Sequence, residues 1–188
     1  MSSRDELQEL QEDLFTISNN TRDEFGRLDV AQLNWKSAPE RWSVGQCFDH
    51  LVTSNAAYFP IFESVINGQK KSRAIERFPL LPNLWGKLLI KSLDPKAPRK
   101  LKAPGRFQPS SSDISGSIIE DFVEHQTKVA ESIEAIGKLN PERIVITSPA
   151  ASMVTYSLMD AFRIIVVHEK RHFQQAQRVT QEARFPSN

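Results

Sequence analysis

The chain has 188 residues, a net charge of +1 and a single cysteine. This length suits one ordinary domain, and the balanced charge disfavours a dedicated nucleic-acid binder, which is usually strongly basic. The lone Cys47 excludes an internal disulfide framework, and a content of only seven glycines disfavours turn-rich all-β folds and glycine-rich phosphate loops.

The first half of the chain carries two segments with the apolar spacing of amphipathic helices. The first covers 3–28, where Ser3 and Glu6 fit a capping box and a stripe of apolar residues follows at intervals of three and four. After a link at 29–42, a second helix is predicted to begin behind Ser43, with Gln46 completing another capping box. It extends to Asn67-Gly68, and Pro60 inside it is expected to kink or split the helix.

Residues 69–112 have a different composition from the rest of the chain. They contain six prolines and eleven Lys or Arg against two acidic residues, so this segment carries +9 and the remainder −8. The pattern predicts a short helix near 84–93 and otherwise extended, loop-like chain. A connection of this length is usually functional or mobile.

Two further helices are predicted in the second half. One covers 113–137, and its stripe includes His125; the other covers 157–183, and its stripe includes His168 and His172. The connector 138–156 contains a stretch of extended character at 143–147 that is too short to define a sheet.

Four long amphipathic segments predict an all-α fold, a four-helix bundle formed by a single domain over 1–188. The long basic crossover at 69–112 permits helices 2 and 3 to run in the same direction, which gives the order up-down-down-up. The longest aliphatic run, 164–167, is far shorter than the ~20 residues that span a bilayer. The first residues are polar and lack the apolar core of a secretory signal, so we expect a cytoplasmic protein without membrane contact.

Three histidines form the main candidate site. His168 and His172 are four residues apart, so their rings project from nearly the same face of one helix and suit two ligands of one metal ion. Both continue the apolar stripe, and His50 in the second helix is a candidate third ligand. Three imidazoles with one open position form a catalytic zinc pattern, and nickel accepts the same ligands. Ordinary hydrogen-bonded core histidines are the alternative explanation of the pattern.

Several other residues are candidates for supporting roles. His125 falls at a similar height in the bundle to His168 and His172, so it is either a fourth ligand or cavity contact, or an ordinary buried histidine. Gln46 and Gln175 each lie one turn from a histidine and are either second-shell residues or, respectively, a helix cap and a surface amide. Glu169 is expected on a solvated face or in an outer ion pair.

The residues around the histidines carry a family resemblance. The segment 42–51, Trp-Ser-Val-Gly-Gln-Cys-Phe-Asp-His-Leu, is similar to the entry into helix 2 of the DinB-like (YfiT-like) superfamily of metalloenzymes. The segment 168–175, His-Glu-Lys-Arg-His-Phe-Gln-Gln, resembles the H-x-x-x-H-x-x-Q signature of its fourth helix. The resemblance implies an up-down-down-up bundle and a nickel or zinc site formed by His50, His168 and His172.

The resemblance also implies several possible activities. Known members include transferases and isomerases that use a low-molecular-weight thiol such as bacillithiol or mycothiol, and others are called hydrolases. A small-molecule substrate and a divalent metal are therefore expected, and segment 69–112 is either a lid that attracts an anionic ligand or a solubilising loop. The alternative is a non-catalytic metal-binding or homodimeric bundle, with a dimer face covered by Phe78, Leu80, Leu81, Leu84 and Trp85.

Overall fold

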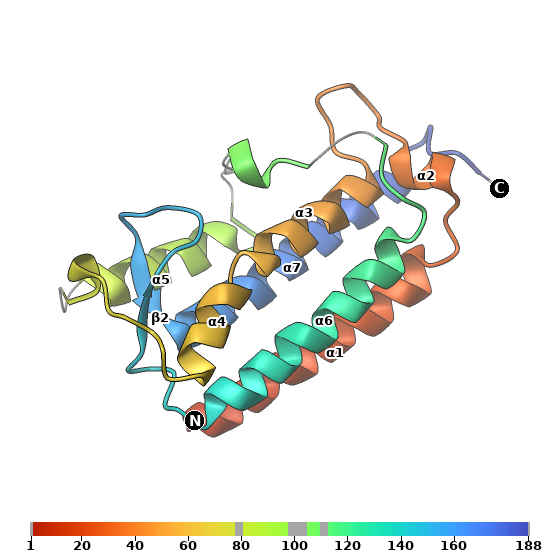
Figure 1. The fold of residues 1–188 in the computed structure, drawn as a ribbon. Coiled ribbons are helices and arrows are strands. Elements are labelled where there is room, and N and C mark those ends of the chain that lie inside the picture. Colours follow the sequence, from red (N-terminus) through yellow and green to blue (C-terminus); the bar gives the residue numbers. More distant parts are fainter. Residues whose placement is uncertain (1, 78–80, 98–104, 110–112, 188) are drawn as a thin grey trace.

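The structure is a computed structural model that describes residues 2–77, 81–97, 105–109 and 113–187. The chain is mostly helical, as predicted. Its α-helices are α1 (Ser3–Phe25), α2 (Val30–Asn34), α3 (Val44–Ala56), α4 (Phe59–Ile66), α5 (Leu81–Leu93), α6 (Ile118–Gly137) and α7 (Leu158–Thr180) (Figure 1). Short 3-10 turns η1 (Ala74–Arg77) and η2 (Gly105–Phe107) lie in the crossover, and β1 (Val145–Thr147) pairs with β2 (Thr155–Ser157).

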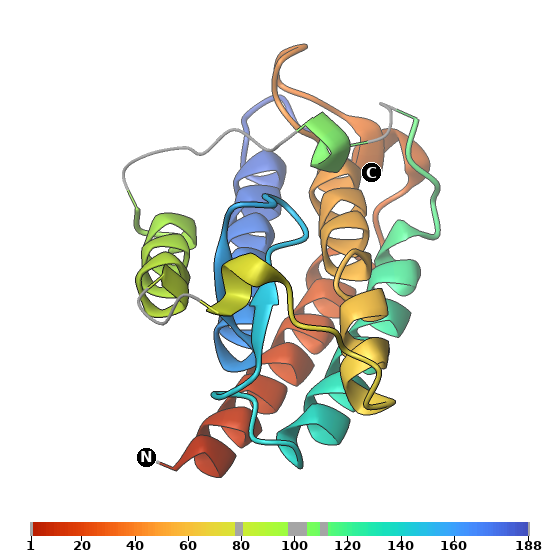
Figure 2. The same ribbon diagram turned by 60° about the vertical axis from the view of Figure 1, so that its left-hand side comes forward.

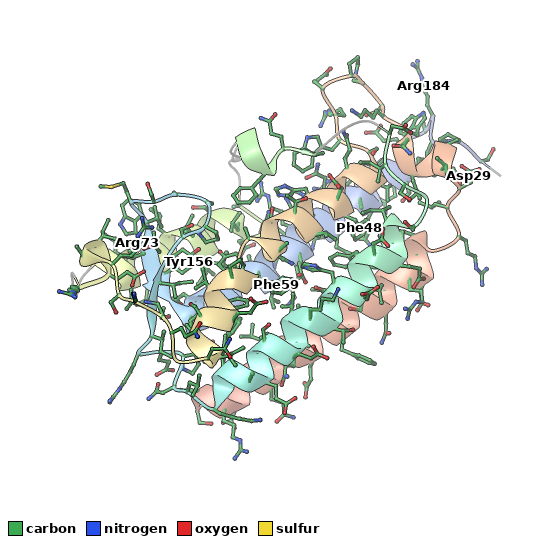
Figure 3. All side chains as sticks on the ribbon, viewed as in Figure 1. Asp29, Phe48, Phe59, Arg73, Tyr156 and Arg184 are labelled. Atoms are coloured by element: carbon green, nitrogen blue, oxygen red, sulfur yellow. The ribbon has the colours of Figure 1, made fainter. Side chains whose placement is uncertain are left out.

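The long helices share one hydrophobic core. Helix α1 packs against α6 and α7, and α3 packs against the same two helices, as Figures 1 and 2 show from two sides. Each of the four contributes a fully buried side chain to this core, namely Leu14, Phe48, Phe122 and Phe162 (Phe48 is labelled in Figure 3). Removal of these apolar stripes from water is the main force that holds the helices together. Within the described ranges, no helix combines the length and the apolarity needed to cross a membrane.

The start of α1 differs by one residue from the prediction. Ser2, rather than Ser3, caps the helix, because its hydroxyl accepts from the Asp5 amide and the Asp5 carboxylate accepts from the Ser2 amide. Both Ser2 with Asp5 and Ser3 with Glu6 have the spacing of a capping box, so local sequence does not distinguish them. The Glu6 carboxylate instead binds the Arg163 guanidinium, with Nε–Oε1 and Nη2–Oε2 distances of 2.5 and 2.6 Å.

Both of the first two predicted helices are interrupted. The segment predicted at 3–28 ends at Phe25, and Asp29 then caps the separate helix α2. The segment predicted from Ser43 begins with the expected capping box but divides into α3 and α4 just before Pro60. Proline has no N–H and its ring clashes with the carbonyl four residues earlier, so an uninterrupted helix is not accommodated there.

The connector between α6 and α7 contains a small antiparallel sheet, which corrects the expectation that 143–147 is too short to define one. Strand β1 pairs with β2 in the register Val145–Ser157, Ile146–Tyr156 and Thr147–Thr155. The sequence predicts no strand at β2, where Thr155 and Tyr156 fall in the expected connector and Ser157 begins the expected fourth helix. The last residue of β2, Ser157, caps α7 by accepting from the Asp160 amide at 3.0 Å.

The basic crossover contributes a helix to the wall of the fold. The predicted short helix is confirmed as α5, which lies beside α7 and β2 (Figure 2). The backbones approach closely at Gly86, where an added Cβ would lie 2.3 Å from the Asp160 carboxylate oxygen. Glycine at this position therefore allows α5 to pack directly on the first turn of α7.

The apolar residues proposed to cover a dimer face lie only partly within the described chain. Phe78 and Leu80, and the side chain of Leu81, lie outside the described residues. Leu84 is 63% exposed, and Trp85 is half-buried. A dimer therefore stays a prediction.

Candidate metal centre

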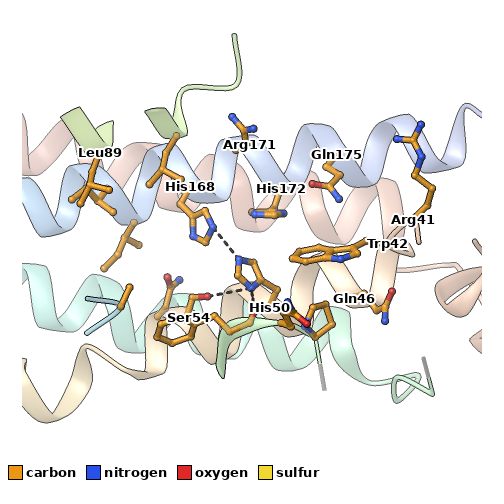
Figure 4. A pocket seen from close by; sticks show the side chains of 18 of the residues that line it. Arg41, Trp42, Gln46, His50, Ser54, Leu89, His168, Arg171, His172 and Gln175 are labelled. Carbon is orange, nitrogen blue, oxygen red and sulfur yellow. Dashed lines mark hydrogen bonds between the residues drawn. The ribbon is translucent and has the colours of Figure 1, made fainter. Parts of the chain in front are cut away.

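Helices α3 and α7 bring three histidine rings together from distant parts of the sequence. The capping box at Ser43 fixes the start of α3, and His50 follows within its second turn. On α7, His168 and His172 face α3 from successive turns (Figure 4). The centroids of the three rings are 4.6–4.9 Å apart, and one nitrogen from each lies within 4.8 Å of the others. The three predicted ligands therefore meet at one point.

The crossover orients the first of these rings. The Nδ1 of His50 donates its hydrogen to the backbone carbonyl of Phe107 in η2, which lies 57 residues later in the sequence. Because a carbonyl only accepts, this bond places the imidazole hydrogen on Nδ1 and leaves the lone pair on Nε2. That Nε2 faces His168 Nε2 at 3.0 Å (Figure 4). His50 is thus oriented with its lone pair toward the other two histidines, as metal-binding histidines usually are.

Burial keeps the three imidazoles neutral at pH 7. It lowers the pKa of His168 to about 3, with a further decrease caused by His50. Burial likewise lowers the pKa of His172 well below its usual value, and it lowers that of His50 despite the opposing bond to Phe107. A neutral imidazole is the form that donates a lone pair to a metal, so none of the three must first lose a proton.

An aromatic side chain fixes the positions of two of the rings. Trp42, directly before the Ser43 cap, stacks on His172 with an interplanar angle of 15° and lies edge-on to His50 at 5.0 Å. Trp42 thus contacts two of the candidate ligands directly. It was not among the site residues predicted from the sequence, and its position directly before the Ser43 cap was the available signal.

The two glutamines have different surroundings. Gln46 serves as the helix cap, because its side-chain oxygen accepts from the Ser43 amide at 3.3 Å. Gln46 and Gln175 also line the cavity that contains the histidines. A role for either in orienting a ligand stays a prediction.

The structure does not bring His125 to the other histidines. Its ring is buried against Phe59 at a centroid distance of 5.0 Å, and it is not among the residues that line the cavity. Its Nε2 is buried and has no hydrogen-bond partner among the described residues. The prediction rested on height along the bundle, which does not specify the rotation of α6, and the ring of His125 contacts Phe59 of α4 instead.

His125 is expected to make the protein sensitive to acid. Burial lowers its folded-state pKa from 6.5 to about 4, with a smaller contribution from Lys128. The unfolded chain therefore binds a proton below pH 6.5 that the folded chain does not, so the free energy of unfolding falls as the pH drops from 6.5 toward 4. When the pH is lowered from 7.5 to 4.5, the free energy of unfolding of His125→Phe should therefore increase by about 2 kcal/mol relative to that of wild type.

Urea unfolding of the metal-free proteins at the two pH values measures this difference. The three site histidines titrate equally in both proteins, so their contribution cancels. An equal stability difference between variant and wild type at both pH values would contradict the assignment.

The carboxylate of Glu169 lies in the core, which corrects its predicted place on a solvated face or in an outer ion pair. The side chain is fully buried, and its two oxygens accept from Asn55 Nδ2 and Gln126 Nε2, each at 2.7 Å. Burial raises the pKa of Glu169 to about 8, although the two amides favour its ionised form. The side chain therefore joins α7 to α3 and α6, and it does not line the cavity.

A comparison with known families places the chain in a superfamily. Residues 16–176 match the family model described as the DinB superfamily. The chain belongs to the DinB superfamily. The match covers all of α3 and the part of α7 that ends at Ala176, so it includes all three histidines. The resemblance inferred from the sequence is confirmed. Neither the curated proteins nor the solved structures gave a match.

The donor set in this DinB-superfamily chain fits a divalent metal. Besides the converging nitrogens, His172 Nδ1 is buried without a hydrogen-bond partner among the described residues. A buried polar atom normally has a partner, and an imidazole nitrogen finds one in a bound cation. Three nitrogen donors suit nickel or zinc better than magnesium or calcium, which prefer oxygen. The three histidines could therefore hold a metal ion and leave a position for a further ligand.

The three histidines lie at a large cavity. The cavity has a volume of about 1090 Å³ and is lined by α3, α5, α7, the β1–β2 loop and η2. Several of its residues were missed by sequence reasoning, above all Phe107, because its role depends on a backbone carbonyl. A tyrosine pair, Tyr58 and Tyr156, also lines it, with a hydroxyl–hydroxyl distance of 2.6 Å.

Proposed function

We propose that this DinB-superfamily protein is a divalent-metal-dependent enzyme that transfers a small thiol to a small-molecule substrate. The observation that carries the proposal is the convergence of three neutral imidazoles at a cavity of about 1090 Å³. A structural zinc site is usually closed by four protein ligands, whereas three ligands beside a cavity favour a reactive site. Nickel and zinc are the metals that the donor set suits best.

The residues of the chain have separate roles in this proposal. His50, His168 and His172 hold the ion, the Phe107 carbonyl fixes the orientation of His50, and Trp42 restrains two of the rings. A divalent ion held by these histidines would lower the pKa of a thiol and so favour its nucleophilic thiolate form. In the proposed transfer the thiol proton goes to solvent, the sulfur forms a bond to an electrophilic carbon of the substrate, and the leaving group departs with its bonding electron pair.

The distribution of carboxylates favours transfer to a thiol over hydrolysis. Hydrolysis at a metal commonly needs a carboxylate or another base that removes a proton from water. Within the described chain, the carboxylates that line the cavity are Glu40 and Glu182, both of which are exposed. Glu169 is adjacent to His168 in sequence, but its two oxygens are bound to Asn55 and Gln126.

The proposal also includes the topology of the bundle, the cellular location of the protein and the class of its substrate. We infer a single four-helix-bundle domain with the order up-down-down-up, which is supported by α1 and α7 running in one direction and α3 and α6 in the opposite one in Figure 1. A cytoplasmic location, where small thiols are kept reduced, agrees with the use of one buried cysteine. The balanced charge supports a small-molecule substrate over nucleic acid.

Thiol binding to the cobalt-loaded protein tests the transferase activity. Bacillithiol, mycothiol and 2-mercaptoethanol would each be added, and the visible cobalt spectrum and the melting temperature recorded. A sulfur ligand should add a charge-transfer band with at least one of these thiols, and the metal-free protein should give no shift in melting temperature. If none of the thiols changes either signal, the thiol transferase proposal is wrong.

A further inference from the structure

The cavity has two chemically different ends, with the three histidines between them. Figure 4 shows Leu89 on one side of the histidines and Trp42 and Arg41 on the other. The lining residues of α7 follow the same order from the apolar to the charged end. Ile164 and Ile165 precede His168, and Arg178 follows His172. A helix rises about 1.5 Å per residue, so Arg178 lies about 9 Å beyond His172 along the axis of α7.

The end near the C-terminus of α7 is rich in cations. Arg41, Lys36 and Arg178 line it, and Arg171 lies near the histidines with its guanidinium donating to the Asp94 carbonyl at 3.0 Å. The whole cavity has four cationic lining groups against two carboxylates, Glu40 and Glu182, and at this end the cations outnumber the carboxylates by three to two. A concave surface with an excess of one charge concentrates ligands of the opposite charge.

Arg41 and Arg178 differ from arginines that stabilise the fold. Arg163, for example, is bound to both Glu6 and Asp160 at 2.5–2.6 Å. Within the described part of the chain, neither Arg41 nor Arg178 has an ion-pair partner. Both are exposed at the cavity, so their guanidinium groups can bind a carboxylate of a ligand with paired hydrogen bonds.

The opposite end is apolar. Leu89 and Leu93 of α5 and Ile164 and Ile165 of α7, two helices that pack together, line the cavity, as does Val154 directly before β2. The hydroxyl groups of Tyr58 and Tyr156 bind each other, so they need no polar partner from a ligand. This end is therefore suited to a nonpolar group of a ligand, which loses contact with water there.

We propose that the cavity binds an amphipathic anion, with its carboxylate at Arg41 and Arg178 and its nonpolar group between α5 and the first half of α7. The reacting centre then lies beside the histidines. The proposal rests on the proposed function for the reaction itself, but the two subsites consist of residues of the chain that do not bind metal. The preferred substrate class is thus a carboxylate with a nonpolar tail rather than a uniformly polar molecule.

Calorimetric titration with matched probes tests the two subsites. The probes are 4-phenylbutanoate, its neutral amide 4-phenylbutanamide, and acetate, each added to the zinc-loaded protein. We expect the carboxylate to bind about tenfold more tightly than the amide, and acetate to bind much more weakly than either, because partly exposed charge pairs contribute modestly and the nonpolar group contributes most. The preference for the carboxylate should decrease at high salt.

Single substitutions test which residues form each of the two subsites. Arg41→Gln and Arg178→Gln should each weaken binding of 4-phenylbutanoate about threefold and leave the amide unchanged. Arg27→Gln, at an exposed arginine outside the cavity, is the matched control and should change neither. Leu89→Gln and, independently, Val154→Ser should weaken both phenyl probes alike.

A metal-free arm separates this proposal from the proposed function. The His168→Ala protein without metal should still prefer the carboxylate and still respond to Arg178→Gln. A preference that disappears with the metal means that the probe binds the ion rather than the arginines, and it overturns the proposal. Equal binding of carboxylate and amide in the zinc-loaded protein also overturns it, whereas failure of all thiols to bind affects only the transferase activity.

Discussion

Replacement of His168 by alanine is expected to lower the affinity for a divalent metal at least about hundredfold while the helical fold persists. Loss of a residue that merely orients a metal ligand usually costs 10- to 100-fold, so loss of a ligand should cost no less. Two histidines then remain, and the His168 nitrogen that lies 3.0 Å from His50 Nε2 is absent. Elemental analysis of protein purified without an affinity tag measures the bound metal, and circular dichroism measures the fold.

Two other histidine variants make this result specific. His50→Ala should lose metal as His168→Ala does, because both nitrogens belong to the same group. His125→Phe removes a buried imidazole that lies outside the group, so it should retain the metal. Full metal content in His168→Ala would refute the assigned site. Loss of most of the protein's stability together with the metal would instead indicate a structural, non-catalytic centre.

Replacement of Glu169 by alanine is expected to destabilise the fold by about 3–4 kcal/mol near pH 4.5, where retention of the Glu169 proton by the folded chain costs little. The change removes the acceptor of two buried hydrogen bonds and leaves the amides of Asn55 and Gln126 without it. It also creates a cavity between α7, α3 and α6, which adds to the cost. Since single domains are typically stable by only about 5–15 kcal/mol, the loss should be obvious in guanidinium unfolding.

The matched control is an acidic residue on the surface. Glu124 lies on α6 with its side chain 73% exposed beside Lys128, so Glu124→Ala should cost less than about 0.5 kcal/mol. A cost of less than about 1 kcal/mol for Glu169→Ala would show that the buried carboxylate does not join the helices.

Glu169 also makes the stability of the protein depend on pH between 4.5 and about 8. Its folded-state pKa of about 8 exceeds the ordinary 4.5, so between these values the folded chain retains a proton that the unfolded chain releases. The contribution of Glu169 to the free energy of unfolding is therefore complete only below this interval, and it is lost as the pH rises through it. Glu169→Gln keeps the shape of the side chain and should remove this dependence.

Local sequence was sufficient to place most helices and some of their ends. Ser43 and Gln46 specified the start of α3 because a capping box is completed within four residues. At α1 the same rule had two solutions, and contacts of Glu6 with α7 decided between them. The second strand of the hairpin was missed because three residues carry too little pattern without their partner.

The candidate site was predictable to the extent that it depends on helix periodicity. The spacing of His168 and His172 placed both rings on one face before any packing was known. The same reasoning failed for Glu169, which lies about 100° around α7 from His168. That face is buried because α3 and α6 supply Asn55 and Gln126, and no property of α7 alone indicates these partners.

The sequence by itself determined the helical fold class, the family and the pair of histidines on one helix, because each of these depends on residues close together in the chain. The sequence offered His50 as a third ligand, and the tertiary structure showed that its ring meets the pair. Only the tertiary structure decided that His125 lies apart and that the Phe107 carbonyl orients His50 across 57 residues. It also decided which cations and apolar groups share the cavity. Such contacts depend on the rotation and packing of whole helices, which are set by the sum of many small burial energies rather than by a local pattern.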